Sequence, residues 1–211
     1  MGTVVLVRHG ETAWNDERRI QGWAPASLND RGRQQAKSLG EHVAARYEVD
    51  RIVASDLRRT TETAREVGRA LPGIDVEFAR AWRERDFGVL QGLAYGDLFG
   101  EYPEFSVQKS GYDAATARPE GGESWVDVFD RIRDAWTELI ETVGEETVVV
   151  VSHGGPIHVV IGLLRGYDVI ETITKVELDN CALTEVGVDG DGAPTLHREG
   201  ETAFLDADAE Q

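Results

Sequence analysis

The chain has little cysteine, little lysine and no long apolar segment. Its single cysteine, Cys181, excludes an internal disulfide and a cysteine cluster for zinc, so we expect a buried structural thiol. Histidines, glycines and a proline interrupt the apolar stretch between Val148 and Leu164, which makes it unsuited to cross a membrane. No charged and then apolar leader precedes the first apolar run, and we expect a cytoplasmic protein.

Basic residues are also scarce. The chain holds 39 acidic residues against 22 lysines and arginines, with a formal net charge of −17, and only three of the basic residues are lysines. Such a surface repels nucleic acids and anionic membranes, so the expected partner is a small molecule, and a homodimer is left open. Strong acidity with little lysine is typical of proteins from salt-loving organisms, where molar salt shortens the screening length to about 3 Å. An ordinary acidic cytosolic protein is the alternative.

The 211 residues contain no internal repeat, proline-rich linker or low-complexity block. We therefore expect one domain over residues 1–205, followed by a frayed tail over 206–211. Residues 93–123 fit no long helix or strand, and we expect a lid or insertion over the site.

Apolar runs and helical periodicity alternate along the chain. The pattern predicts strands near 3–8, 51–54, 75–78, 147–152, 180–187 and 194–199, and helices near 30–47, 56–71, 124–142 and 156–165. This alternation favours a parallel α/β sheet, and the turn between the last two strands predicts an antiparallel edge.

Cationic or protonatable side chains follow three of these strands. Arg8 and His9 follow the first, Arg58 lies in the first turn of the helix after the second, and His153 follows the strand that begins at Thr147. Ligands collect beyond the carboxyl ends of strands in open α/β sheets. A cation in the first turn of a helix is unfavourable unless an anion joins it, although pairing with Glu62 is the alternative for Arg58. Together the three segments predict a pocket for a tetrahedral dianion.

Four ordered segments carry a family resemblance. The segments Leu6–Asn15, Ser55–Thr60, Glu84–Gly92 and Ser152–Gly154 resemble the signature blocks of the histidine phosphatase superfamily, in particular its branch of phosphoglycerate mutases and broad-specificity phosphatases. The resemblance implies a three-layer α/β/α sandwich on a mostly parallel sheet and a phosphohistidine mechanism with no metal and no other cofactor.

The resemblance also implies roles for individual residues. His9 is similar to the nucleophile of the family, Glu84 to the proton donor, and Arg8, Arg58 and His153 to its phosphate clamp. Further phosphate or substrate contacts are implied at Asn15, Gln21, Gly22 and Gly154. The chemistry is coherent, because phosphoryl transfer needs mainly positioning and charge stabilisation, and an alkoxide leaving group needs a proton.

The expected activity is hydrolysis of a phosphomonoester. The segment 93–123 is rich in aromatic residues and has only Lys109 and Arg118 as cations, which favours an apolar or aromatic ester over the phosphoglycerates of a mutase. A cofactor-dependent phosphoglycerate mutase is the alternative. A non-catalytic phosphate-binding regulatory module is more remote, because every implied catalytic residue is present. His153 and His158 lie five residues apart, which does not suit a metal site on one helix face.

Overall fold

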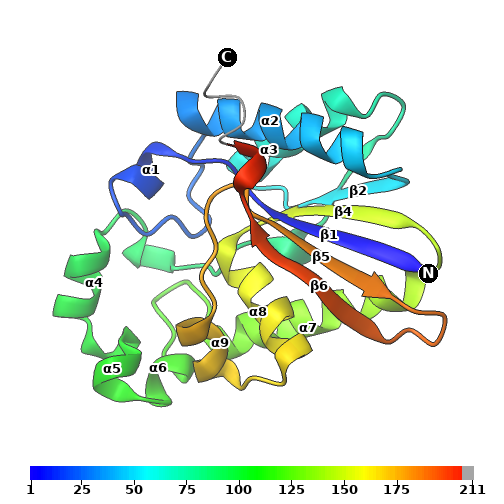
Figure 1. Ribbon diagram of the computed structural model, residues 1–211. Helices are drawn as coiled ribbons and strands as arrows, with labels where there is room; N and C mark the ends of the chain where they lie inside the picture. The colour runs from blue at the N-terminus through cyan, green and yellow to red at the C-terminus, as the bar shows by residue number, and fades with distance from the viewer. Residues whose placement is uncertain (206–211) are drawn as a thin grey trace.

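The computed structural model describes residues 1–205, and a six-stranded sheet runs through this part of the chain (Figure 1). Its strand order is β3-β2-β4-β1-β5-β6. The strands are β1 (Gly2–Arg8), β2 (Arg51–Ala54), β3 (Val76–Phe78), β4 (Thr147–Ser152), β5 (Leu183–Val188) and β6 (Pro194–Glu201). The first four pair in parallel, while β5 and β6 are antiparallel. The predicted mostly parallel sheet with an antiparallel edge is confirmed.

Helices cover both faces of this sheet. Helices α2 (Asp30–Arg46) and α3 (Arg58–Ala70) lie on one face, and α7 (Trp125–Thr142) and α8 (Gly154–Arg165) lie on the other (Figure 1). Successive strand side chains point to opposite faces. Val5 and Val7 accordingly join the core under α2 and α3, whereas Val4 and Leu6 join the core under α7 and α8. A strand buried on both faces has a continuous apolar sequence, as β1 does.

The helices at the site begin in different ways. The Asn29 side chain accepts a 2.7 Å hydrogen bond from the backbone of Gly32 and caps α2, and Ser124 and Asp127 form a capping box at α7. Helix α3 has no side-chain cap, and it starts at Arg58, two residues later than predicted. The side chains of Ser55 and Asp56, just before this helix, have other partners, because Ser55 lies against His153 and Asp56 pairs with Arg83.

The segment 93–123 folds as a series of short helices, which we call the lid. They are α4 (Tyr95–Glu101), the 3₁₀ turn η3 (Pro103–Phe105), α5 (Val107–Ser110) and α6 (Asp113–Thr116), and they lie to one side of the sheet (Figure 1). Leu98 and Phe105 from the lid pack with Ile20 and Leu90 in a small core separate from the sheet. The lid is therefore folded on its own apolar cluster.

The remaining elements are short. They are α1 (Ala13–Asp16), η1 (Arg80–Trp82), η2 (Gly88–Leu90), α9 (Val169–Lys175) and η4 (Ala203–Leu205). Helix α9 was not predicted from the sequence, and the expected tail over 206–211 lies outside the described residues. Over residues 1–205, none of the helices has the length and apolar character needed to cross a membrane.

Candidate active site

The carboxyl ends of β1, β2 and β4 meet at one edge of the sheet. Arg8 pairs with Ser152 across β1 and β4, and Ala54 pairs with Val151 across β2 and β4. The residues that directly follow these strands are therefore neighbours in space. Of the side chains that we expected after the strands, Arg8 and His9 line one cavity, His153 packs beside His9, and Arg58 lies outside the cavity.

His9 follows β1 and is only 3 % exposed. Its Nδ1 lies 2.7 Å from the carbonyl oxygen of Gly10, which can only accept, so Nδ1 carries the proton. The lone pair is then on Nε2, where the Nε–H of Arg59 donates a 3.1 Å hydrogen bond. Nδ1 of the imidazole is thus held by the backbone of Gly10, and the unprotonated Nε2 lies beside a cation.

The surroundings of His9 keep its ring neutral. Burial lowers the pKa of His9 well below 6.5, and the nearby charges of Arg59 and Arg8 lower it further, against a small opposing effect of the Gly10 carbonyl. A neutral imidazole has a free lone pair and can attack phosphorus. His9 is therefore a competent nucleophile at neutral pH.

The arginine of the second segment that reaches the cavity is Arg59, not Arg58. Arg59 is 1 % exposed, and its Nη2 donates a 2.8 Å hydrogen bond to the carbonyl of Gly22. The side chain of Arg58 is 61 % exposed and pairs with Glu62 at 2.9 Å. The assignment of Arg58 to the phosphate clamp is therefore corrected to Arg59, and the alternative pairing with Glu62 is the one observed.

The phase of α3 explains this difference. Val67 faces the core, and Arg58 precedes it by nine residues, which is two and a half helical turns and the opposite side of the helix. Arg59 precedes the buried Thr63 by four residues and shares its face. The hydrophobic stripe of this helix contained the information needed to select Arg59.

Arg8 and His153 also lie at the centre of the site. Nη1 of Arg8 donates to the carbonyl of Leu178, while its buried Nε has no hydrogen-bond partner. The His153 ring packs edge-on against the His9 ring with 5.2 Å between centroids, and its Nε2 lies 2.8 Å from Oγ of Ser55. His153 is fully buried and lies next to His9, but it is not among the residues that line the cavity.

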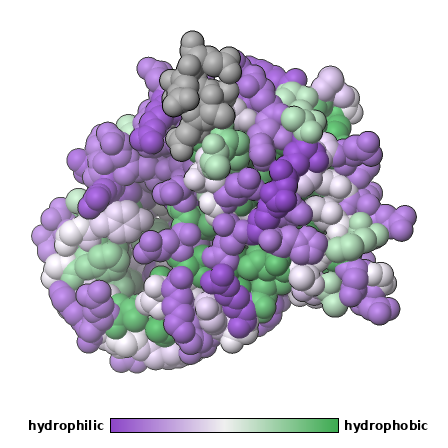
Figure 2. Space-filling model, viewed as in Figure 1, coloured by the Kyte–Doolittle hydropathy of each residue, from purple (hydrophilic) through white to green (hydrophobic). Residues whose placement is uncertain are grey.

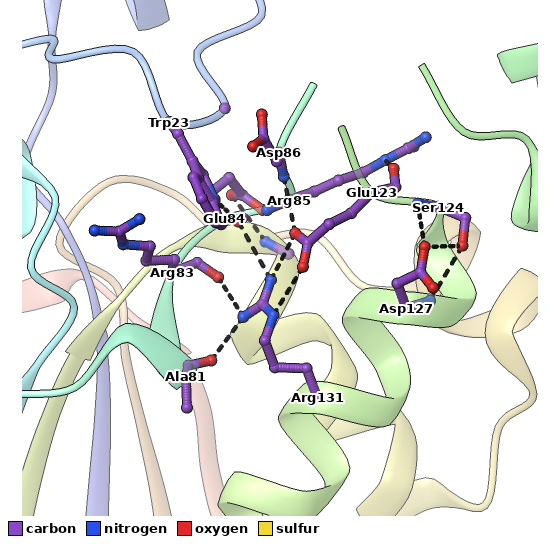
Figure 3. Close-up of polar contacts among 12 residues, drawn as sticks. Trp23, Ala81, Arg83, Glu84, Arg85, Asp86, Glu123, Ser124, Asp127 and Arg131 are labelled. Carbon is purple, nitrogen blue, oxygen red and sulfur yellow. Dashed lines mark hydrogen bonds and ion pairs between the residues drawn. The ribbon is translucent and has the colours of Figure 1, made fainter. Parts of the chain in front are cut away.

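Glu84 extends into the same cavity from the loop after η1. Its carboxylate accepts hydrogen bonds from the backbone N–H groups of Arg85 at 2.8 Å and Gly155 at 3.2 Å. A Cβ atom on Gly155 would lie 2.3 Å from Glu84 Oε1, so a side chain there would displace the carboxylate. Trp23 Nε1 donates to the Glu84 carbonyl at 2.7 Å (Figure 3). Glu84 is thus held through its backbone and its carboxylate.

The other expected contact residues line the cavity as well. They are Asn15, Gln21, Gly22 and Gly154. Asn15 completes a capping box with Thr12 at α1, and Gln21 accepts a 3.0 Å hydrogen bond from the Thr12 hydroxyl. Gly154 is the first residue of α8, where free backbone N–H groups favour an anion.

The cavity has a volume of about 500 Å³ and is largely apolar beyond these groups. The lid contributes Tyr95, Leu98, Phe99, Phe105 and Val107 together with the polar Ser106 and Gln108, and α9 contributes Ile173 and Thr174. Apolar side chains reach the surface over the lid on an otherwise mostly hydrophilic face (Figure 2). In residues 1–205, no group of three or more histidine, cysteine, aspartate or glutamate side chains is placed to hold a metal ion.

Two further cavity residues were not selected from the sequence. His158, one turn after Gly154 in α8, lines the cavity with a buried Nε2 that has no partner, and burial lowers its pKa to about 4. Tyr95 opens the lid helix α4, and its hydroxyl is within electrostatic range of Glu84, Arg8 and Arg59. Helical spacing from Gly154 pointed to His158, whereas the only signal for Tyr95 was its place among the aromatic residues of segment 93–123.

Comparisons with known proteins identify relatives of this chain. Phosphoglycerate mutase-like protein 4 of Arabidopsis thaliana is 39 % identical over 162 residues, which cover 73 % of this chain and 67 % of the relative. Probable phosphoglycerate mutase GpmB of Salmonella choleraesuis is 34 % identical over 183 residues, covering 87 % and 83 %. These relatives carry mutase names.

Solved structures of similar fold carry phosphatase names instead. A mycobacterial glucosyl-3-phosphoglycerate phosphatase is 29 % identical with a TM-score of 0.82, covering 96 % of this chain and 100 % of its own. A phosphoserine phosphatase from Entamoeba histolytica is 27 % identical with a TM-score of 0.84, covering 97 % and 100 %. The family model of the histidine phosphatase superfamily (branch 1) matches residues 4–202. With that match over nearly the whole chain, the protein belongs to branch 1 of the histidine phosphatase superfamily.

Proposed function

We propose that this chain is a phosphomonoester hydrolase that works through a phosphohistidine on His9, with Glu84 as the proton donor. The observation that carries the proposal is the position of the His9 lone pair, which lies on Nε2 beside Arg59 in a cavity that also holds Arg8 and Glu84. Two arginines and one carboxylate leave an excess of positive charge where a phosphate dianion would bind.

The reaction has two steps. His9 Nε2 attacks phosphorus, the ester P–O bond breaks, and Glu84 gives its proton to the departing oxygen. Water then attacks phosphorus as Glu84 takes a proton from it, the P–N bond breaks with its electron pair returning to His9 Nε2, and inorganic phosphate leaves. Arg8 and Arg59 stabilise the charge on the phosphoryl oxygens, which is the main requirement of phosphoryl transfer. The scheme uses no metal.

The cavity wall favours an apolar or aromatic alcohol. Beyond the phosphate end, aromatic and aliphatic side chains of the lid dominate the lining. The two lid cations are engaged elsewhere: Lys109 donates to the Phe99 carbonyl and Arg118 pairs with Asp127. Arg19 does line the cavity, but it pairs with Glu17 at 2.5 Å. Arg85 also lines the cavity, but its guanidinium donates to the backbone carbonyls of Glu123 and Ala117, so a second anionic group on the substrate would meet few free donors.

A phosphoglycerate mutase is the second candidate, because relatives of this chain carry that name. The test is a panel of phosphomonoesters that includes aryl phosphates, alkyl phosphates and 2- and 3-phosphoglycerate, assayed in excess EDTA. We expect release of inorganic phosphate from the aryl and apolar alkyl esters, with weaker activity on the phosphoglycerates. Interconversion of the two phosphoglycerates without phosphate release would establish the mutase instead.

Replacement of Arg59 by alanine should slow phosphorylation of His9 by about 10²–10³-fold, the scale for losing one group that stabilises transition-state charge. Arg58→Ala is the matched variant, and it should change little, because an exposed ion pair contributes only about 0.2–1 kcal/mol. Single-turnover kinetics and thermal melting of both variants make the comparison. A large kinetic loss in Arg58→Ala with an intact Arg59→Ala would reverse the assignment of the phosphate clamp.

A further inference from the structure

The loop that carries Glu84 is held by one arginine of helix α7. Arg131 lies on α7, and its Nη1 donates to the carbonyls of Ala81 at 2.6 Å and Arg83 at 3.0 Å. Its Nη2 lies 3.4 Å from the carbonyl of Glu84 itself (Figure 3). One guanidinium therefore contacts three backbone carbonyls on the approach to the proton donor.

Glu123 completes the arrangement from the end of the lid segment. Its carboxylate accepts from Nε and Nη2 of Arg131 at 3.0 and 2.9 Å. The same carboxylate accepts from the backbone N–H of Asp86 at 3.0 Å, and the Glu123 N–H donates to the Asp86 carbonyl at 2.8 Å. Glu84 thus lies between two points of attachment, the carbonyls held by Arg131 and the Asp86 backbone held by Glu123 (Figure 3).

We propose that Arg131 and Glu123 are positioning residues for Glu84. They orient the Glu84 carboxylate toward the leaving oxygen of the substrate. The inference rests on the proposed function, because it assumes that Glu84 gives the proton. Neither residue is among those that line the cavity, so neither touches substrate. Their effect passes through the backbone of residues 81–86 to a carboxylate that has only two backbone hydrogen bonds of its own.

The geometry requires a guanidinium. Arg131 uses three nitrogens in one plane to reach carbonyls and a carboxylate that lie in different directions, which is the fork geometry of arginine. A lysine has a single nitrogen and cannot make the same set of contacts. Arg131→Lys therefore keeps the positive charge next to Glu123 and removes the set of hydrogen bonds that holds the loop of residues 81–84.

The experiment measures phosphorylation of His9 in single turnovers with two esters, an alkyl phosphate and 4-nitrophenyl phosphate. In Arg131→Lys we expect a loss of about 10–100-fold for the alkyl ester, since a misplacement of about 1 Å can cost 10²-fold. The nitrophenyl ester should lose little, because nitrophenolate leaves without a proton. The inhibition constant for inorganic phosphate should stay unchanged, because the phosphate end of the cavity is intact.

Two further variants separate positioning from a merely structural role. Arg133→Lys is the matched control on the same helix, where the arginine pairs only with exposed acids, and it should leave both esters unaffected. Glu123→Gln should show the same ester dependence as Arg131→Lys, and it carries the test if Arg131→Lys does not fold. Equal losses for the two esters, with weaker phosphate inhibition, would overturn the proposal.

The same measurement in a Glu84→Gln background distinguishes a failure of the positioning role of Arg131 from a failure of Glu84 as the proton donor. With the donor absent, adding Arg131→Lys should not widen the difference between the esters any further, because the two changes act on one step. A further selective loss for the alkyl ester would show that Arg131 acts independently of Glu84 and would contradict the inference. If Glu84→Gln alone shows no ester dependence, the failure lies with the proposed proton donor.

Discussion

Replacing His9 with alanine should reduce turnover of every phosphomonoester by about 10⁴–10⁶-fold, the scale seen when a covalent nucleophile is removed. The reason is that Nε2 of His9 is the unprotonated ring nitrogen, and it lies beside the buried Arg59 in the cavity that Arg8 also lines. Wild-type protein quenched during turnover of a labelled ester should carry an acid-labile, base-stable phosphoryl group. His9→Ala should carry none.

The control for this experiment is His197→Ala. His197 lies on β6 beside Glu185, outside the cavity, and its removal should leave both turnover and label intact. His158 is the histidine to examine next if label persists in His9→Ala, since it lines the same cavity. Persistent label on the variant would mean that another side chain is the nucleophile.

The low pKa of His9 adds a pH dependence to this prediction. A histidine with an ordinary pKa near 6.5 would lose its free lone pair as the pH fell through that value. Burial and two arginines hold the pKa of His9 well below 6.5. The phosphorylation rate should therefore show no decline attributable to His9 between pH 7 and 6, which a pH series of single turnovers would test.

Much of the fold could be predicted from the sequence because its signals are local. The apolar runs around Val5 and Val149 mark strands buried on both faces, and the periodic stripe of α2 marks a helix with one buried face. The position of His9 at a strand end followed from the same pattern. These features depend on a few neighbouring residues, so a single sequence contains them.

The features that were missed depend on contacts between distant segments. Helix α3 starts at Arg58, later than predicted, and the Ser55 hydroxyl that precedes it hydrogen-bonds to His153, 98 residues away in the chain. The loop around Glu84 is fixed by Arg131, which the sequence places in an ordinary amphipathic helix. Tyr95 reaches the site because its backbone N–H bonds to the carbonyl of Arg18. Pairings of this kind leave no periodic pattern.

Substituting glutamine for Glu84 should slow phosphorylation of His9 by an alkyl phosphate about 10²–10⁴-fold, the usual contribution of a general acid. An alkoxide is a strongly basic leaving group and needs the proton as the P–O bond breaks. A nitrophenolate is stable without it, so phosphorylation by 4-nitrophenyl phosphate should fall much less. Glutamine keeps the size of the side chain, but its amide NH2 cannot accept the hydrogen bond that one of the two carboxylate oxygens accepts from the N–H of Arg85 or Gly155, so thermal melting of the variant is the control for the loop.

This comparison must be made on the first chemical step, by burst or single-turnover kinetics. In the proposed mechanism Glu84 also takes the proton from water when the phosphohistidine is hydrolysed, so steady-state turnover of both esters would slow alike and hide the difference. Equal losses for the two esters in the first step would show that Glu84 is not the donor. Asp86 would then be examined next, because it lies two residues away on the same loop that Arg131 and Glu123 hold in place.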